Sequence, residues 1–528
     1  MAYRVILAFV LSLIIILAYD YFFVRKYQQQ QPSKQPQEKI EERDDYFKPL
    51  ELPVSPKAVK TDFGRDIAVS TSLYEATFSE KGGCLKNFLL EGYREDVTPN
   101  SPHKRLILAD DNPPLRLRFL NTNFETMSYH CSKDRLELTR WQKPSQLSFT
   151  AENSSLLVKK IYTFYPNNYY FDLKIVLENK GKEVFKDNLI LSLANKWPRK
   201  QGYRSFSGAV FWLDNKFKSL KQKKIKDKIV RAGEVKWVGL SDEYFMTVII
   251  NKAFDKASFI LNTHSELLSC EFLTPPIVLA PNEKRSISFL LYFGPKEIDR
   301  LKTLGFHLDR AVDFGFFSSI SKLALYVLKW FYRFTHNYGI AIIVLTLVIK
   351  ILFWPLTHHS YKSMKDMQRL KPQIDKIRQR YKDDKVRMNQ EMMNLYRTYK
   401  INPMGGCLPM ILQIPVFFAL YYALLHAIEL RHAAFITYFP FTQKIWLADL
   451  SAKDPYYITP IIMGVSMLVQ QKLTPAASMN PTQEKLMLLM PIFFTVIFLN
   501  FPSGLVIYWL INNILSIVQQ IYINRRFE

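Results

Sequence analysis

The sequence predicts an α-helical polytopic membrane protein with six transmembrane helices, five of which form a core. It also predicts a large extracytoplasmic antiparallel β-sandwich domain and a cytoplasmic helical hairpin. Apolar runs near the start of the chain and after residue 336 predict the helices, and short alternating runs between them predict the sandwich. The third observation is a net charge of +24, from 71 Lys and Arg against 47 Asp and Glu. Because the cations lie beside the apolar runs, they favour membrane topology over sequence-specific nucleic-acid binding.

The first 60 residues predict a membrane anchor followed by a linker. An uncharged run at 5–19 lies between Arg4 and Asp20. A cleaved signal peptide is the alternative, but no small-residue cleavage site follows the run, so we interpret residues 1–27 as an uncleaved signal-anchor helix. Residues 28–60 are rich in Gln, Pro and charge, which predicts a disordered linker.

Residues 61–296 predict the β-sandwich. Runs such as DIAVSTSLYEATF, SLLVKKIYTFYP, YYFDLKIVLEN and SISFLLYF alternate with period two and are separated by Gly, Asn, Asp or Pro. The region contains no apolar run of span length. Four of its aromatic residues could line a ligand groove, but packing in the core or at its rim is the preferred interpretation: Tyr169, Tyr170, Trp212 and Trp237.

Residues 297–336 predict an amphipathic helix lying in the membrane interface. Lys322, Lys329 and Arg333 share one helical face, and apolar residues cover much of the remaining surface. A linker helix packed on the β-domain is the alternative that the sequence leaves open.

The second span, 337–357, contains the run NYGIAIIVLTLVIKILFWP, in which Lys350 follows Thr346 by one helical turn. A charge near the centre of a membrane helix costs about 2.5–3.5 kcal/mol on translocon scales. Some other feature must offset that cost, and we expect this feature to bear on function.

The remaining segments set the topology. Residues 358–400 carry 12 Lys and Arg against 5 Asp and Glu, and two apolar stripes in them are separated by KDDK, which predicts a helical hairpin. The positive-inside rule places this hairpin, and therefore both termini, in the cytoplasm and the β-domain in the periplasm. In order, we expect a hairpin at 358–403, a third span at 404–427, a periplasmic loop at 428–455, a fourth span at 456–472, a cytoplasmic loop at 473–485, a fifth span at 486–501 and a sixth at 504–524.

The fourth and fifth spans are short. Each has about 16 uncharged residues and would cover roughly 24 Å, which favours a locally thinned bilayer.

Polar residues recur inside these spans. Tyr508, Asn512, Ser516 and Gln519 form one stripe on the last helix. Amides among lipid tails need partners, so we expect a water-filled groove open to the cytoplasm with Lys350 at its wall. Snorkelling of Lys350 combined with ordinary hydrogen bonds between helices is the alternative. The groove residues that we expect are Thr346, Lys350, Gln413, Gln470, Tyr508, Asn512 and Ser516.

Catalysis is not expected. The chain has no H-E-x-x-H, G-x-S-x-G or Walker motif, and no pair of carboxylates inside the spans. We therefore expect no enzyme activity, no cofactor and no metal. The four cysteines, Cys84, Cys131, Cys270 and Cys407, have no C-x-x-C or zinc spacing, so neither a zinc site nor a disulfide framework is expected. A small-solute transporter or channel, and a carbohydrate-binding module on a membrane anchor, are the alternative functions.

Three stretches carry a resemblance to a known family: QEMMNLYRTYKINPMGGCLPMILQIPVFFALYYAL, DPYYITPIIMGVSMLVQQKL and FPSGLVIYWLINN. The chain resembles the YidC-type membrane protein insertases in their long Gram-negative form, a family shared with mitochondrial and chloroplast insertases. The resemblance implies a chaperone and insertase for nascent membrane proteins in the bacterial inner membrane, acting alone or with the Sec translocon. It also implies possible ribosome contact through the basic hairpin and the 473–485 loop. Its β-domain resembles the sugar-mutarotase sandwich, which by itself assigns no catalysis.

The resemblance assigns roles to individual positions. The family's groove cation falls on Lys350, its groove threonine on Thr346, and the aromatic pair of its last helix on Tyr508 and Trp509. Two positions depart from the family pattern. The cation is typically arginine, so bidentate pairing with a carboxylate is lost in Lys350. Trp509 stands where tyrosine is common, which removes a hydroxyl from the expected substrate path.

Overall fold

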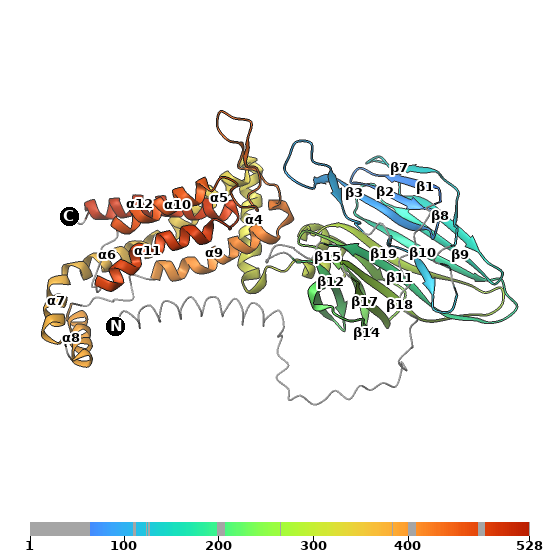
Figure 1. Cartoon of the computed structure of the whole chain (residues 1–528), viewed down its shortest axis with the longest axis horizontal. Helices are drawn as coiled ribbons and strands as arrows, with labels where there is room; N and C mark the ends of the chain where they lie inside the picture. The colour runs from blue at the N-terminus through green and yellow to red at the C-terminus, as the bar shows by residue number, and fades with distance from the viewer. Residues whose placement is uncertain are drawn as a thin grey trace. The chain divides into compact units, whose positions relative to one another are not determined.

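The structure is a computed structural model that describes residues 64–108, 112–122, 124, 127–197, 206–264, 266–382, 384–399, 408–473 and 481–526. The predicted signal anchor at 1–27 and linker at 28–60 lie outside these residues. The described residues up to Val312 belong to one compact unit and those from Asp313 onward to another. The first is β-rich and the second is helical (Figure 1).

The β unit contains three sheets. Strand order is β4-β3-β2-β1-β7 in the first, β13-β12-β15-β16-β19-β10-β9-β8-β6 in the second and β14-β17-β18-β11-β5 in the third. The described strand pairs in these sheets are antiparallel except β1 with β7, which is parallel. The strands are β1 (Asp66–Ser70), β2 (Tyr74–Ser79), β3 (Cys84–Arg94), β4 (His103–Arg105), β5 (Leu117–Phe119), β6 (His130–Cys131), β7 (Arg135–Glu137), β8 (Ser145–Glu152), β9 (Leu156–Phe164), β10 (Tyr170–Asn179), β11 (Phe185–Lys196), β12 (Gly208–Leu213), β13 (Lys216–Lys221), β14 (Ile229–Gly233), β15 (Val235–Ser241), β16 (Phe245–Asn251), β17 (Ala257–His264), β18 (Leu267–Leu279) and β19 (Lys284–Pro295).

The predicted run DIAVSTSLYEATF is not one strand but the hairpin β1–β2. The Thr71 hydroxyl accepts hydrogen bonds from the backbone N–H groups of Leu73 and Tyr74, at 3.2 and 3.1 Å. A threonine side chain that bonds the backbone two and three residues on favours a turn over continued strand.

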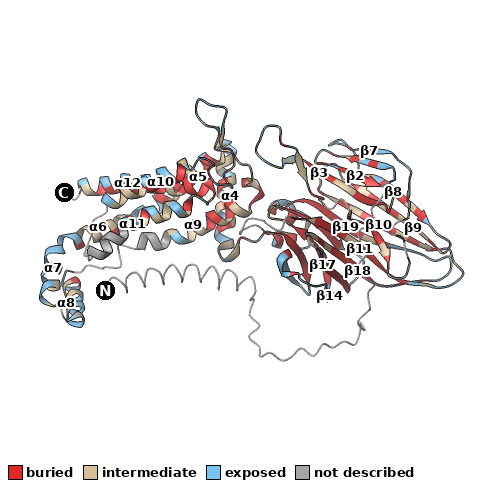
Figure 2. Cartoon of the chain, viewed as in Figure 1, coloured by how far each residue is buried: buried red, intermediate tan, exposed pale blue. Residues whose placement is uncertain are grey.

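The core of the β unit is aromatic. Phe171 of β10 and Phe293 of β19 face Phe88 of β3, with ring centroids 6.4 and 5.4 Å from it. On the third sheet, Phe272 of β18 meets Phe289 of β19 at 5.3 Å. One face of the nine-stranded sheet therefore packs against both smaller sheets, and Figure 2 shows buried residues along β10 and β19.

The predicted interfacial region 297–336 is divided between the two units. The short helices α3 (Ile298–Leu304) and η3 (Leu308–Ala311) follow β19 and belong to the β unit. The helix α4 (Ser318–Thr335) belongs to the helical unit, where it packs against α5 and α9.

The helical unit is built around α12. This helix packs against α5, α9 and α10, and α10 packs against α11 (Figure 1). The unit begins with η4 (Gly315–Phe317) and α4. The helices that follow are α5 (Tyr338–Leu352), α6 (Trp354–Arg369), α7 (Lys371–Arg380), α8 (Lys385–Thr398), α9 (Leu408–His426), α10 (Ile458–Leu473), α11 (Pro481–Phe498) and α12 (Ser503–Arg526). Between α9 and α10 lie η6 (Ile428–Leu430) and the strand pair β20 (Ile436–Tyr438) and β21 (Ile445–Leu447).

Two boundaries differ from the predicted spans. The expected span 337–357 ends as a regular helix at Leu352, and Pro355 lies in the first turn of α6. Proline has no N–H to donate, so it favours the start of a new helix over continuation of the old one. At the other boundary α11 begins at Pro481, so part of the expected loop 473–485 is helical.

Length and apolar composition mark one described helix, Ser503–Arg525, as able to cross a membrane alone. Gly315–Thr335 and Tyr338–Leu352 meet the same criterion only as a pair, and that pair bends by 119°. Gln413–His426 and Leu488–Phe498 are shorter apolar helices.

The two predicted apolar stripes of the hairpin meet each other. Met367, Leu370 and Ile374 from α6 and α7 form a buried cluster with Tyr396 of α8, against which Met392 and Leu395 pack. The first arm is broken at Leu370, because Pro372 begins a separate helix. The hairpin therefore has three helices instead of two.

Candidate functional site

Lys350 lies on the side of α5 that faces the interior of the helical unit. Asn337 caps this helix by accepting a hydrogen bond from the Ile340 N–H at 3.1 Å, and the apolar run that follows propagates it. The Lys350 side chain is buried, with 6% of the residue exposed, and its Nζ donates to the Ser516 hydroxyl at 2.6 Å. The cation that the sequence singles out therefore points at the polar stripe of α12, inside the helical unit.

Ser516 and Asn512 extend this contact along α12. The Ser516 hydroxyl donates to the backbone carbonyl of Asn512 at 2.7 Å while it accepts from Lys350. The Asn512 and Gln413 side chains exchange hydrogen bonds of 3.0 and 3.4 Å, which join α12 to α9. Side-chain amides in an apolar environment need hydrogen-bond partners, and these two amides satisfy each other.

Tyr361 is a member of the site that the sequence analysis missed. Its hydroxyl interacts by hydrogen bonds with Ser516 of α12 and Gln470 of α10. The sequence analysis places this residue in the hairpin, whereas the structure packs α6 against α9 and α12. The sequence feature that points to Tyr361 is Pro355, because it marks the start of α6 near the expected end of the span.

Lys350, Tyr361, Gln413, Gln470, Asn512 and Ser516 thus form one hydrogen-bonded cluster from α5, α6, α9, α10 and α12. We call these six residues the polar cluster. Thr346 lies one turn from Lys350, is buried and donates to the Ile342 carbonyl of its own helix at 2.7 Å. Tyr508 is buried one turn before Asn512.

Trp509 lies in a different environment from the rest of the expected site. Its ring packs against three phenylalanines, with centroids 5.3 Å from Phe417, 6.3 Å from Phe494 and 5.6 Å from Phe498. Its indole N–H is buried without a hydrogen-bond partner. The structure therefore separates Trp509 from the polar cluster and places it among aromatic rings of α9 and α11.

Further polar contacts continue beside the cluster. Gln519 donates to the Thr357 hydroxyl at 2.7 Å, and Asn513 donates to the Ser466 hydroxyl at 3.1 Å. The Gln519 side-chain oxygen has no partner although the residue is fully buried. α12 therefore carries polar groups toward four neighbouring helices, α5, α6, α9 and α10.

The electrostatic character of the polar cluster is set by Lys350. Within the described part of the chain, no carboxylate forms an ion pair with it, and its hydrogen-bond partner is the Ser516 hydroxyl, which leads to the amides of Asn512 and Gln413. A buried cation without a counter-ion is costly and attracts negative charge. Among the described residues, no group of three or more His, Cys, Asp or Glu could hold a metal ion.

Similarity to known proteins shows which family the chain belongs to. The model of the family described as "60Kd inner membrane protein" matches residues 330–528, and that of the "YidC periplasmic domain" matches residues 66–327. The membrane protein insertase YidC of Geobacter metallireducens is 41% identical over 491 residues, covering 90% of this chain and 88% of that protein. The YidC insertase of Geotalea daltonii is 38% identical over 535 residues, covering 99% of each. The chain belongs to the YidC family.

The chain is also similar to solved structures, at lower sequence identity. One described as an active YidC insertase crystal structure with the first transmembrane domain resolved covers 88% of this chain and 94% of that one, with 19% identity and a TM-score of 0.38. A galactose mutarotase-like protein from Lactobacillus casei covers 43% of this chain and 99% of that one, at 10% identity and a TM-score of 0.31. Membership of the YidC family therefore rests on the sequence relatives and the family models, and it identifies the chain as a membrane protein.

Proposed function

We propose that this chain is a membrane protein insertase of the bacterial inner membrane, in which the polar cluster around Lys350 receives the polar segment of a nascent client. The observation that carries the proposal is the placement of the Lys350 ammonium, which lies inside the helical unit on the hydroxyl of Ser516. The named function of relatives about 40% identical over most of their length supports the same activity.

The mechanism is electrostatic and needs no nucleotide hydrolysis by this chain. A polar or charged segment that enters lipid tails pays a large desolvation cost. A path lined by hydroxyl, amide and ammonium groups replaces part of the water that the segment loses, and the cation attracts acidic residues in it. The client's hydrophobic segment can then leave sideways into lipid while its polar tail crosses.

The topology that we propose has six spans, with both termini and the hairpin in the cytoplasm and the β unit in the periplasm. The bent pair α4–α5 fits a helix in the membrane interface that turns into a span, because α4 exposes one apolar stripe of Leu323, Tyr326, Trp330 and Phe334. On the other side of α4, Lys329 pairs with Glu429 at 3.2 Å.

The partners that we propose are nascent membrane proteins and the Sec translocon, with ribosome contact through the basic hairpin and the segment 473–485. Residues 358–400 carry 12 Lys and Arg against 5 Asp and Glu, and this excess of positive charge suits an anionic partner.

Cysteine labelling tests the groove. In a background whose native cysteines are replaced by serine, single cysteines at Thr346, Lys350 and Asn512 should react with a membrane-impermeant maleimide added from the cytoplasmic side. A cysteine at Ile351, which is 69% exposed on the outside of the helical unit, should face lipid and stay unlabelled. The absence of labelling at all three inner positions would show that no water reaches the polar cluster and would overturn the groove.

A further inference from the structure

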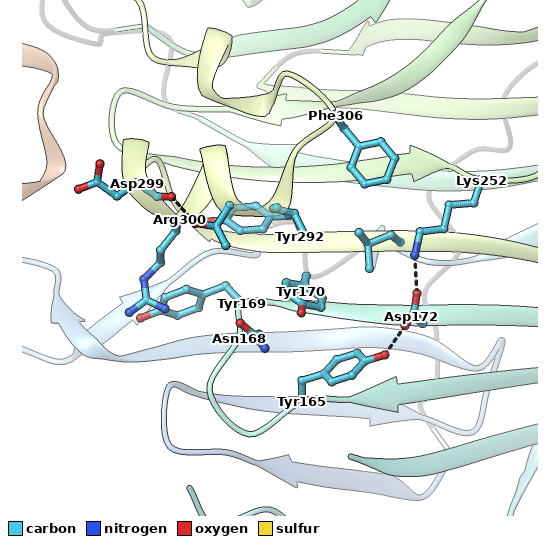
Figure 3. Close-up of a pocket in the computed structure, with 13 residues that line it drawn as sticks. Tyr165, Asn168, Tyr169, Tyr170, Asp172, Lys252, Tyr292, Asp299, Arg300 and Phe306 are labelled. Atoms are coloured by element: carbon cyan, nitrogen blue, oxygen red, sulfur yellow. Dashed lines mark hydrogen bonds and ion pairs between the residues drawn. The ribbon is translucent and has the colours of Figure 1, made fainter. Parts of the chain in front are cut away.

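A cavity of about 670 Å³ lies on one face of the nine-stranded sheet of the β unit (Figure 3). Its floor contains Tyr170 and Asp172 of β10 and Leu290 and Tyr292 of β19. These residues alternate with Phe171 and Phe293, which point into the aromatic core, so the cavity opens on the opposite face of the sheet. The volume is in the range of sites for small molecules.

The floor of this cavity offers no free backbone to a ligand. β10 is hydrogen-bonded to β9 and β19, and β19 is hydrogen-bonded to β10 and β16. A peptide that binds as an added strand needs an open sheet edge, and both floor strands lie inside the sheet. Recognition at this site therefore falls to side chains.

One wall is a loop held in an unusual backbone conformation. Gly305, Phe306 and His307 have positive φ angles of 83°, 54° and 59°. Such angles are uncommon for residues other than glycine and persist where the surroundings impose them. Here the Trp237 indole N–H donates to the Phe306 carbonyl at 2.9 Å, and the His307 ring stacks on Trp212 at 4.6 Å. The loop thereby presents the Phe306 ring at the rim of the cavity, where it is exposed.

Both cations of the cavity lie in ion pairs. The Lys252 ammonium lies 3.0 Å from Asp172, whose other oxygen accepts a 2.6 Å hydrogen bond from the Tyr165 hydroxyl, as Figure 3 shows. Arg300 pairs with Glu297 at 2.6 Å and lies over the Tyr169 ring at 5.2 Å. The hydrogen bond to Asp172 raises the pKa of Tyr165 to about 12, so its hydroxyl stays protonated. The lining carries Lys252 and Arg300 against Asp172 and Asp299, so its formal charges balance and little net charge remains to attract an ionic ligand.

We propose that this cavity binds a neutral saccharide, which would pack its ring on Tyr170 and Phe306 and hydrogen-bond to Tyr165, Asn168, Asp172 and Arg300. A pyranose ring has apolar C–H faces that suit aromatic surfaces, and hydroxyls that need donors and acceptors held in place. A phosphate or carboxylate ligand would instead need a cation that is not already paired. This binding is separate from the proposed insertase activity and uses none of the polar cluster.

Saturation-transfer NMR on the full chain tests the proposal. The protein is kept in lauryldimethylamine oxide, because maltoside and glucoside detergents carry sugar headgroups. The probes are glucose, maltose, cellobiose and N,N′-diacetylchitobiose at millimolar concentration, with an uncharged tetrapeptide as the competing class. We expect transfer to the ring C–H protons of at least one sugar and none to the peptide.

Variants assign that signal to the cavity. Tyr170→Ala should weaken sugar binding by at least about tenfold, roughly 1.4 kcal/mol, and Tyr165→Phe should weaken it by removing one hydroxyl. Trp141→Ala is the matched control, since Trp141 is 88% exposed and lies outside the cavity; it should bind as the wild type does. Protection of the buried Cys270 thiol reports whether each variant is folded.

Three results would overturn the proposal. The first is no transfer to any of the four sugars. The second is transfer that a folded Tyr170→Ala variant retains in full, because the sugar would then bind elsewhere. The third is Tyr170-dependent transfer to the peptide with none to the sugars, which would make the cavity a peptide site.

Discussion

At the scale of single residues, the charge of Lys350 matters more than its shape. The ammonium has a hydroxyl partner in Ser516 and could gain a carboxylate from a client. A charge pair at 4 Å is worth up to about 4 kcal/mol at an effective dielectric constant near 20. Arginine at this position keeps the charge and adds donors for bidentate pairing.

We therefore predict that Lys350→Arg retains insertion of a single-span client with an acidic tail, whereas Lys350→Ala lowers its rate by at least about tenfold. Protease protection of the tail after reconstitution into proteoliposomes measures the rate. The same client with an uncharged tail is the control and should be affected far less. A fully active Lys350→Ala variant would show that the charge is dispensable.

A second lysine, Lys160 of β9, shows how the β unit handles a buried charge. Its residue is fully buried, and Nζ donates to the backbone carbonyls of Gly82, Gly83 and Leu115 at 2.9, 3.0 and 3.0 Å. The ammonium also lies 4.9 Å from the Tyr129 ring. These contacts join β9 to two loops of the β unit, and burial lowers the pKa of Lys160 to about 7.

This lowered pKa makes stability depend on pH. Above pH 7 the folded state releases the proton while the unfolded state keeps it up to about 10.4, so the unfolded state binds more protons. We predict that the free energy of unfolding rises between about pH 7 and 8.5, by up to about 1.4 kcal/mol per pH unit. Urea-dependent labelling of the buried Cys270 thiol measures it.

Lys160→Met should remove this pH dependence and destabilise the β unit, because three carbonyls lose their donor. Lys174→Met, at an exposed position of β10, should keep the wild-type pH dependence. An unfolding free energy that changes with pH equally in wild type and Lys160→Met would show that another group is responsible.

At the scale of elements, Gly464 sets how closely α10 approaches α11. A Cβ atom at this position would lie 3.2 Å from Cβ and 3.3 Å from Cγ2 of Thr495, and closer still to its hydroxyl. Small residues allow such close packing of membrane helices. We predict that Gly464→Leu lowers the free energy of unfolding of the detergent-solubilised protein by about 1–3 kcal/mol, and therefore lowers its melting temperature.

Val465→Leu is the control for this substitution, since Val465 is exposed next to Gly464. Fluorescence-detected size-exclusion chromatography after heating compares the two variants. Equal melting of Gly464→Leu and Val465→Leu would contradict the close packing of α10 on α11.

The elements show where sequence patterns succeed. Period-two alternation was enough for β9 and β10, because one face of each is buried in the core, whereas β19 is buried on both faces from Phe289 onward. It missed β18, which contains Pro275 and Pro276. The structure tolerates these prolines at a bulge opposite Asn188, where the Leu189 N–H donates to the Thr274 hydroxyl at 3.0 Å in place of a ladder bond.

In the candidate site, too, the sequence pattern predicts some features and misses others. The polar stripe on α12 could be read from its helical spacing, and the structure buries Tyr508, Asn512, Ser516 and Gln519 together. The partners of that stripe depend on how helices pack, so Tyr361 could not be found from spacing. Trp509 was assigned by resemblance, and its surroundings are set by Phe417, Phe494 and Phe498 on other helices.

At the scale of the whole molecule, the chain has two compact units, and each contains one of the two proposed sites. Every member of the polar cluster belongs to the helical unit, and every residue of the saccharide cavity belongs to the β unit. The sequence predicted this division through its change of periodicity near residues 61 and 297. The boundary itself lies at Val312, because α3 and η3 pack with the strands, and no change of composition marks that packing.

We predict that a chain lacking residues 66–312 still inserts a single-span client, at a rate within about threefold of the full chain, because the polar cluster is intact. The same deletion combined with Lys350→Ala is the control and should insert poorly. Protease protection of the client's tail in proteoliposomes measures the rate, and growth after depletion of the host insertase shows whether the deletion variant supports viability. Loss of growth in a stably expressed deletion variant would assign an essential step to the β unit.

The central claim is that a client passes along the polar cluster. A photo-crosslinking amino acid at Thr346 or Lys350, with a stalled nascent single-span protein as the client, tests this claim most directly. Val348, which is 46% exposed on the same helix as Lys350, is the matched position outside the cluster. The account predicts crosslinks from positions 346 and 350 to the client's polar tail, and mainly lipid adducts from position 348. Crosslinks from 348 with none from 346 or 350 would contradict it.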